Sequence, residues 1–252
     1  MSRHIAMVAG AALCSLCASH ALAQEVDEFG TYGGAHSLES PQHFALELRL
    51  GPYRPRIDSE FDGTTPYRDV FGNKTRVMAA LEFDWQAWRL DGVGSLGPGF
   101  GLGYTRMSAG ALLTGESGRA DQKTTLNILP LWAAAVLRVD ALARRTVVPL
   151  AFYAKTGLAT GLWWSDSGNG TSRDAGGLVG KGRSDGWLLA GGLMLDTSFI
   201  EPSAARDLDN SSGVNHCYFF GEWMWLDLGA FSPASSMRVG ANTWLGGIAF
   251  EF

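Results

Sequence analysis

Ionisable side chains that could form an internal charge network recur at every second position in several stretches of the sequence. Glu47 and Arg49 are two residues apart, and so are Glu82 and Asp84. Side chains at positions i and i+2 of an extended strand lie on one face, so each pair would project to the same side. Acids and bases are mixed, and charges removed from water persist when they are paired. The predicted network comprises Glu47, Arg49, Glu82, Asp84, Arg138, Lys155, Asp196 and Glu222, with Gln86 beside them.

The elements that would position these charges are β-strands. In the first stretch, Phe44, Leu46 and Leu48 alternate with Glu47 and Arg49. Such alternation indicates a strand with one apolar and one polar face. The alternating stretches are 42–53, 76–88, 97–107, 126–140, 149–164, 185–199, 215–228 and 237–252. We therefore predict eight strands, and we expect Arg49 to meet Glu82 or Asp84 because the first two strands are neighbours.

The connections between these strands alternate in length. The long, polar connections are 54–75, 108–124, 165–184 and 229–236, and the short ones are 89–96 and 141–147, with 200–214 as the exception. Long loops at one end and short turns at the other are typical of outer-membrane barrels. The sequence therefore predicts an all-β fold, an eight-stranded antiparallel up-and-down transmembrane β-barrel. Pro202 and Gly213 predict one short helical turn in the 200–214 connector. A soluble barrel with an aromatic core is the alternative.

The N-terminal residues have the pattern of an export signal. Arg3 and His4 form a basic start, Ile5 to Cys17 an apolar core, and Ala21 to Ala23 a cleavage site. We predict a cleaved signal peptide at 1–23 that directs export by the Sec route, an N-terminal periplasmic segment at 24–41 and an outer-membrane barrel domain at 42–252. A membrane anchor helix and a lipoprotein are the alternatives for the first segment.

The net charge of −5 provides no basic footprint for nucleic acid.

The chain ends in the strand WLGGIAFEF. Its pattern resembles the C-terminal signal by which outer-membrane barrels are handed to the barrel-assembly machinery. Gly247, Phe250 and Phe252 match that signal, whereas Leu245 stands where a polar residue is usual. In a barrel the last strand closes against the first, so its apolar face would meet lipid.

Longer stretches carry a second resemblance. They are SPQHFALELRLGPYRPRIDSEFDG, LEFDWQ, SLGPGFGLGYTRM, DLDNSSGVNHCYFFGEW and the closing strand. With them the chain resembles an uncharacterised family of outer-membrane β-barrel proteins of myxobacteria and their relatives, with an OmpA/OmpX-like small-barrel architecture. This resemblance implies a fold and a location in the bacterial outer membrane, and no defined activity.

The residues that remain indicate no enzymatic or metal chemistry. A membrane hydrolase needs a nucleophile and a histidine oriented by a carboxylate. His36 precedes the first strand, and His43 and His216 stand at strand starts on the inner side, away from the outer leaflet. The DSGNG stretch at 166–170 lacks the closing glutamate of an EF-hand. We predict no enzyme, no cofactor and no metal site.

The predicted barrel has an interior that side chains can fill. The preferred interpretation is an integral outer-membrane protein with a filled lumen and a structural or surface-interaction role. Its exposed loops 54–75, 108–124 and 165–184 would contact partners or lipopolysaccharide. A narrow channel or small-solute transporter is the alternative, and a lipid-modifying hydrolase a remote one.

Overall fold

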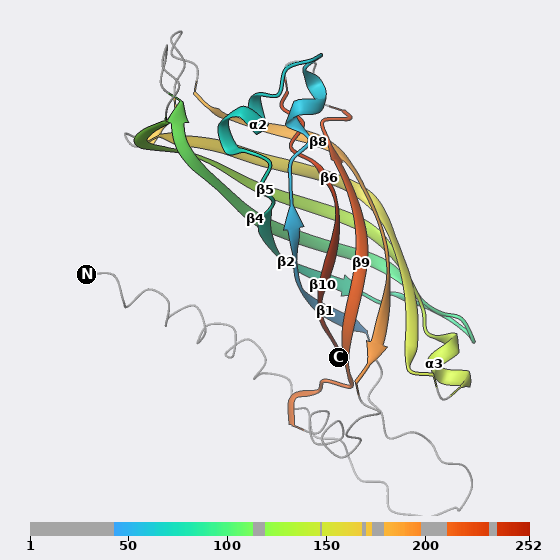
Figure 1. Ribbon diagram of the computed structural model, residues 1–252. Coiled ribbons are helices and arrows are strands. Elements are labelled where there is room, and N and C mark those ends of the chain that lie inside the picture. The colour runs from blue at the N-terminus through green and yellow to red at the C-terminus, as the bar shows by residue number, and fades with distance from the viewer. Residues whose placement is uncertain are drawn as a thin grey trace, which may run out of the picture. The chain divides into compact units, whose positions relative to one another are not determined.

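The computed structural model describes residues 43–112, 119–146, 148–167, 170–172, 179–197, 211–231 and 236–252. The predicted signal peptide 1–23 and the predicted periplasmic segment 24–41 lie outside these residues. Within the described ranges the chain is built from long antiparallel strands that wrap into a closed barrel (Figure 1). None of the described helices has the length and apolar character needed to cross a membrane.

Eight of the described strands form the barrel wall. They are β1 (Phe44–Tyr53), β2 (Arg76–Trp85), β4 (Gly94–Leu112), β5 (Arg119–Val139), β6 (Leu150–Ser167), β8 (Lys181–Asp196), β9 (His216–Leu228) and β10 (Ala241–Glu251). The short strands β3 (Trp88–Leu90) and β7 (Gly170–Thr171) pair with β4 and β6, respectively. Each wall strand pairs antiparallel with its neighbour in the chain, and β10 pairs with β1. The predicted eight-stranded up-and-down barrel is thereby confirmed.

The closure between the first and last strands explains why the chain ends on an apolar, aromatic strand. Leu48 pairs with Ile248, and the backbone N–H of Phe252 donates to Phe44 O at 2.9 Å. The N–H of His43 in turn donates to Phe252 O at 2.8 Å. Because the final residue is part of the hydrogen-bonded ladder, its side chain is held on the barrel wall.

The hairpin of β4 and β5 is longer than the predicted strands 97–107 and 126–140. It continues into the region predicted as the polar loop 108–124, where Ser108 pairs with Thr125 and Gly110 with Lys123. Backbone hydrogen bonds hold this extension, and a ladder needs no apolar side chains. The prediction of a loop over this whole range was therefore wrong, because apolar alternation stops before the strands do.

Short helices occupy two of the predicted connections. In 54–75 the chain forms η1 (Ile57–Glu60) and α2 (Pro66–Phe71), and α3 (Ala141–Arg145) lies in the connection 141–147. Pro66 suits the first turn of a helix, and Gly72, at φ 74°, ends it. The helical turn predicted in 200–214 falls mostly outside the described residues, which begin again with a helical backbone at Ser211 and Ser212.

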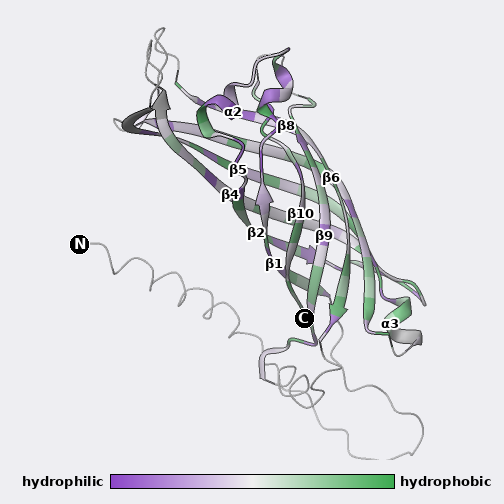
Figure 2. Ribbon diagram, in the orientation of Figure 1, coloured by the Kyte–Doolittle hydropathy of each residue, from purple (hydrophilic) through white to green (hydrophobic). Residues whose placement is uncertain are grey.

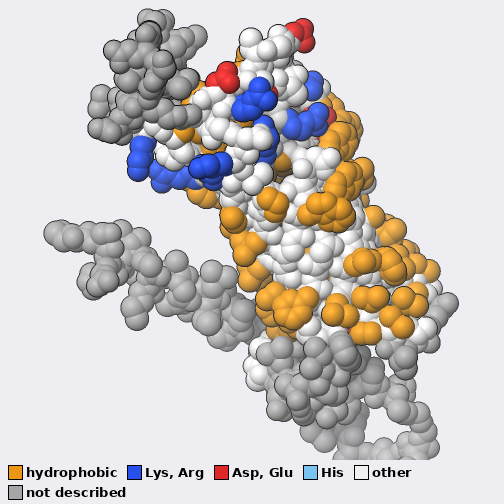
Figure 3. Space-filling view, in the orientation of Figure 1, with side chains coloured by type: hydrophobic (Ala, Val, Ile, Leu, Met, Phe, Trp, Pro, Cys, Tyr) orange, Lys and Arg blue, Asp and Glu red, His pale blue; other side chains and the backbone are white. Residues whose placement is uncertain are grey.

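The outer wall of the barrel is apolar. Val77, Trp244 and Leu50 are 69%, 67% and 60% exposed, and hydrophobic side chains cover much of the wall in Figure 3. Figure 2 shows hydrophilic residues at the end that carries α2. On β8 the outward apolar positions run from Trp187 to Leu195. At about 3.3 Å per residue and a tilt near 40°, this length covers roughly 20 Å of the barrel axis, close to a lipid-facing band.

Candidate functional site

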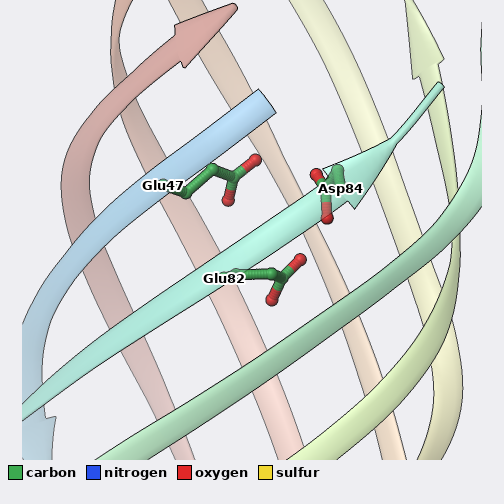
Figure 4. Close-up of side chains that lie close together, drawn as sticks. All are labelled: Glu47, Glu82 and Asp84. Carbon is green, nitrogen blue, oxygen red and sulfur yellow. The ribbon is translucent and has the colours of Figure 1, made fainter. Parts of the chain in front are cut away.

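The barrel interior holds a cluster of charged side chains that we call the charged layer. Its members, all at most 3% exposed, are Glu47, Arg49, Glu82, Asp84, Arg138, Lys155, Glu222 and Glu251. They project inward from β1, β2, β5, β6, β9 and β10. Figure 4 shows three of the carboxylates, from β1 and β2, converging inside the barrel. The alternation of the strands places them there, because every second side chain points to the lumen.

Arg49 joins carboxylates from three strands. It is paired with Glu47 two residues along β1, and its guanidinium nitrogens lie 3.3 Å from Glu82 Oε1 and 2.8 Å from Glu222 Oε1. The contact with Glu82 was expected from the neighbouring strands. The planar guanidinium also lies 5.5 Å from the ring centre of Phe220. A single cation thus links β1, β2 and β9 across the lumen.

Lys155 occupies the space between the acids of β1 and β2. Its Nζ donates to Glu47 Oε2 at 2.9 Å and to Glu82 Oε1 at 2.5 Å, and it lies 3.7 Å from Asp84 Oδ2. The carboxylate oxygens of these acids are within 4.8 Å of one another, a spacing that could hold a metal ion. An ammonium already at hydrogen-bonding distance from two of them leaves these residues a poor fit for a metal.

Arg138 closes the layer near the short-turn end of the barrel. It is paired with Glu251 and lies 3.2 Å from Glu47 Oε1 and 3.5 Å from Asp84 Oδ2. Gln86 Nε2 and Tyr218 Oη also donate to Glu251, at 2.6 and 2.9 Å. The last strand is therefore tied through one carboxylate to β5, to β9 and to the residue that follows β2.

An inward-facing row of glycines on β4 makes room for this network. A Cβ at Gly99 would overlap Asp84, and one at Gly101 would overlap the Trp132 ring. The Trp132 indole crosses this space and donates from Nε1 to Glu82 Oε2 at 2.5 Å. The alternation of glycine with Phe100 and Leu102 in the sequence thus reflects a wall that is apolar outside and empty of side chains inside.

The structure brings together most of the predicted network residues and leaves one apart. Asp196 stands at the end of β8, where its carboxylate lies 2.8 Å from His216 Nδ1, at hydrogen-bonding distance. Its side chain is 15% exposed and pairs with His216, so we count Asp196 apart from the buried charged layer. Glu251, Trp132 and Tyr218 were not among the predicted residues. Glu251 could have been found from its position between Phe250 and Phe252, which places it on the opposite face.

The part of the lumen towards α2 is an apolar layer. Its larger buried members are Tyr53, Met78, Met107, Leu126, Ile128, Leu188, Met224, Leu226 and Leu228. Ile57 of η1 and Tyr67 of α2 are also buried against it, at 6% and 3% exposure. The segment between β1 and β2 therefore folds over the mouth of the barrel.

Hydrogen bonds from backbone and side chains hold this cap. Asp58 accepts a hydrogen bond from the Tyr67 N–H at 2.7 Å, and the Arg56 N–H donates to Gly240 O at 2.9 Å. Tyr67 Oη lies 3.3 Å from Met107 Sδ inside the barrel. Burial raises the pKa of Tyr67 above its ordinary value of 10.0. The cap is thus anchored both to the wall and to the apolar layer below it.

No family model matches the chain, and no curated protein matches it in sequence. Among solved structures, it is similar to Neisserial surface protein A, with 11% identity over 84% of this chain and 97% of that one and a TM-score of 0.42. It is also similar to OprG from Pseudomonas aeruginosa, with 14% identity over 85% and 97% and a TM-score of 0.42. A third similar structure is the attachment invasion locus protein Ail of Yersinia pestis, solved with the heparin analogue sucrose octasulfate. Its identity is 11% over 84% of this chain and 97% of that one, with a TM-score of 0.40. Identities this low carry no function across, and the myxobacterial resemblance stays a prediction.

Proposed function

We propose that the chain is an integral protein of the bacterial outer membrane, with a lumen closed by its own side chains and a structural or surface-interaction role. The observation that carries this proposal is the inverted polarity of the barrel. Large apolar side chains such as Leu50, Val77 and Trp244 are exposed on the outer wall, while Glu47, Arg49 and Lys155 are buried inside. A water-facing protein does not expose an apolar belt of this extent, whereas a bilayer requires one.

The filled lumen supports a structural or binding role over transport. The charged layer occupies one part of the interior, the apolar layer with its cap occupies another, and a smaller cluster around Tyr153 and Phe220 is buried as well. A cavity of about 10 Å³ lies between Asp84, Gln86 and Arg138, at the lower limit for a single water molecule. Solutes would have to displace packed side chains to pass.

The location is tested by expressing the full chain in a Gram-negative host. We expect it to sediment with the outer-membrane fraction, to require detergent for extraction and to migrate faster on gels when unheated. Recovery as a monodisperse protein in detergent-free buffer would overturn the proposal.

The alternative of a narrow channel or transporter is tested with purified protein in planar bilayers. We expect no steady unit currents, with a general diffusion porin in the same bilayer as the positive control. Regular unit currents would favour the channel. For the remote alternative, a lipid-modifying hydrolase, we expect an unchanged lipid A mass after overexpression.

The assembly signal is proposed to act through Phe250 and Phe252. Gly247 has a structural reason of its own, because a Cβ there would overlap Leu48 O and the Phe220 ring. Phe252→Ala therefore tests recognition by the assembly machinery better than a Gly247 variant. We expect less Phe252→Ala in the outer membrane, with normal folding of the purified variant in detergent.

A further inference from the structure

The outer wall carries an apolar groove of about 360 Å³ between β5, β6 and β8. Leu131 and Ala133 of β5 and Leu158 of β6 line it, together with Phe231. The small side chain of Ala133 stands opposite Leu158, which is 59% exposed. The alanine leaves a depression that the larger neighbours border.

Phe231, on one side of the groove, belongs to an aromatic pair. Phe231, which is 50% exposed, meets Trp187 edge-to-face with a ring-centre distance of 4.6 Å. Trp187 is also the first of the outward apolar positions of β8. The groove therefore lies at the border of the apolar belt, on the side of the long loops.

Cations stand at that border. Arg183 also lines the groove; its Nε donates to Asp185 Oδ1 at 2.7 Å, and its side chain is 66% exposed. Lys181 is the next outward position of β8 towards the long loops. It lies in one row across the sheet with Trp164, Asn127 and Arg106, each the register partner of the next. Arg106 and Lys181 are exposed as well. Figure 3 shows Lys and Arg side chains gathered at this end of the barrel, above the apolar wall.

We propose that this groove binds a diacyl lipid with a phosphate headgroup, with an acyl chain along Ala133 and Leu158 and the phosphate at Arg183 and Lys181. The inference rests on the proposed function, since the groove meets lipid only if the barrel spans a membrane. Its chemistry is amphipathic in the order that a lipid requires: the groove is apolar in the belt, and at its edge Lys181 adds a cation beside the Arg183–Asp185 pair. Guanidinium groups suit phosphate oxygens because their N–H donors form a planar fork.

The test compares two lipids with the same acyl chains, dioleoyl phosphatidic acid and dioleoylglycerol. The full-length protein in detergent is titrated with each, and bound lipid is counted by native mass spectrometry. We expect phosphatidic acid to bind at least about fivefold more tightly, the size of one exposed ion pair. Inorganic phosphate should not displace it, since the acyl chain contributes to binding.

Two variants separate the headgroup site from the groove. Arg183→Gln with Lys181→Gln should bring phosphatidic acid to the level of dioleoylglycerol, and Ala133→Trp should weaken both lipids by filling the groove. Arg238→Gln, a cation of the same end outside the groove, is the matched control and should change neither. All variants change exposed side chains, so heat-modifiability should be kept.

Equal binding of the two lipids by the unmodified chain, or unchanged binding by both groove variants, would overturn the inference. If the unmodified chain showed the mass of a dimer and Ala133→Trp showed only that of a monomer, a second copy of the chain would occupy the groove, and the lipid inference would be overturned. Flotation with vesicles distinguishes the two proposals. A chain that does not float contradicts the proposed function, while one that floats without preferring phosphatidic acid contradicts the lipid site alone.

Discussion

The two layers of the lumen solve the same packing problem with opposite chemistry. In the charged layer, Arg49, Arg138 and Lys155 are surrounded by carboxylates at distances of about 2.5 to 4.0 Å. In the apolar layer, side chains such as Leu226 and Met224 are completely buried among others of their kind. Both layers face the interior of the barrel, so burial inside the barrel alone does not decide which chemistry is used.

The difference teaches what each layer requires of its neighbours. An apolar side chain is stabilised by any close contact, and its loss leaves a cavity. A buried ion requires a particular partner, and its loss leaves an uncompensated charge. The charged layer therefore specifies which strands lie together, whereas the apolar layer supplies stability that is less selective. The charged layer has five carboxyl groups against three cations, so the loss of any cation is the more damaging change.

The largest effect is expected for Arg49→Ala. Its removal leaves Lys155 as the only cation among the described residues that still pairs with all three of Glu47, Glu82 and Glu222, at a cost of about 3–5 kcal/mol in the free energy of unfolding. The measurement is the urea midpoint in detergent, with the heat-modifiability midpoint on gels as a second readout. Arg89→Ala is the control, because its 3.5 Å pair with Asp140 is partly exposed and worth less than about 1 kcal/mol. A loss as small as that of Arg89→Ala would contradict the charge network.

The double variant Arg49→Met with Glu222→Gln sharpens the comparison. Removing one charge of each sign should restore about half or more of the loss seen in Arg49→Ala, because buried ion pairs are often replaced at little cost. Additive losses in the urea midpoint would show that shape, and not charge, governs this layer.

For Leu226→Ala we expect a slightly smaller decrease in the free energy of unfolding, about 3 kcal/mol. Leu226 is completely buried in the apolar layer, so its truncation leaves a cavity. Unlike Arg49→Ala, this loss should be recovered in part by Leu226→Met, which nearly conserves volume. Equal losses for the two substitutions at Leu226 would contradict simple apolar packing.

Gly101→Ala tests the boundary between the layers. A methyl group there would displace the Trp132 ring, which donates to Glu82, and should cost about 1–3 kcal/mol by overpacking. Gly221→Ala is the matched control, because its Cβ would meet nothing within 4 Å. The difference in urea midpoint between these two variants measures how tightly the boundary is packed.

The smallest effect is expected at the cap. Burial raises the pKa of Tyr67 above 10.0, so the folded state favours the neutral phenol. The resulting stabilisation is present below pH 10 and is lost as the pH rises through the raised pKa. The unmodified chain should lose more stability than Tyr67→Phe between pH 9 and 11, by less than about 1 kcal/mol. Parallel curves for the two proteins would contradict this role.

The sequence predicted the barrel because most strands keep the two-residue alternation. The predicted and observed strands differ mainly where that pattern fails. Ser108 and Thr125 are paired in a ladder although neither is apolar, so the β4–β5 extension could not be recognised. The charged side chains were recognisable one by one, but their partners depend on barrel closure, which brings Glu222 to Arg49 across 173 residues of chain.

The apolar layer was not predicted for a related reason. In β9, Met224 and Leu226 point inward beside the outward Trp223 and Trp225, so both faces are apolar and the alternation disappears. The cap was missed because Ile57 and Tyr67 lie in a polar stretch of sequence, and their burial depends on the residues of the barrel mouth. The local sequence pattern therefore predicts the strands well. It predicts which side chains fill the barrel lumen only where the two faces of a strand differ in polarity.

The pairing of β1 with β10 has a consequence for biosynthesis. The seam joins residues almost the whole barrel sequence apart, with Ala45 opposite Glu251. Contacts of such long range form slowly, since most of the chain must be ordered first. Until the last strand arrives, β1 and β9 would each present an unsatisfied edge that invites association with other chains. We therefore expect that truncation of even the final strand produces aggregates in place of a smaller barrel.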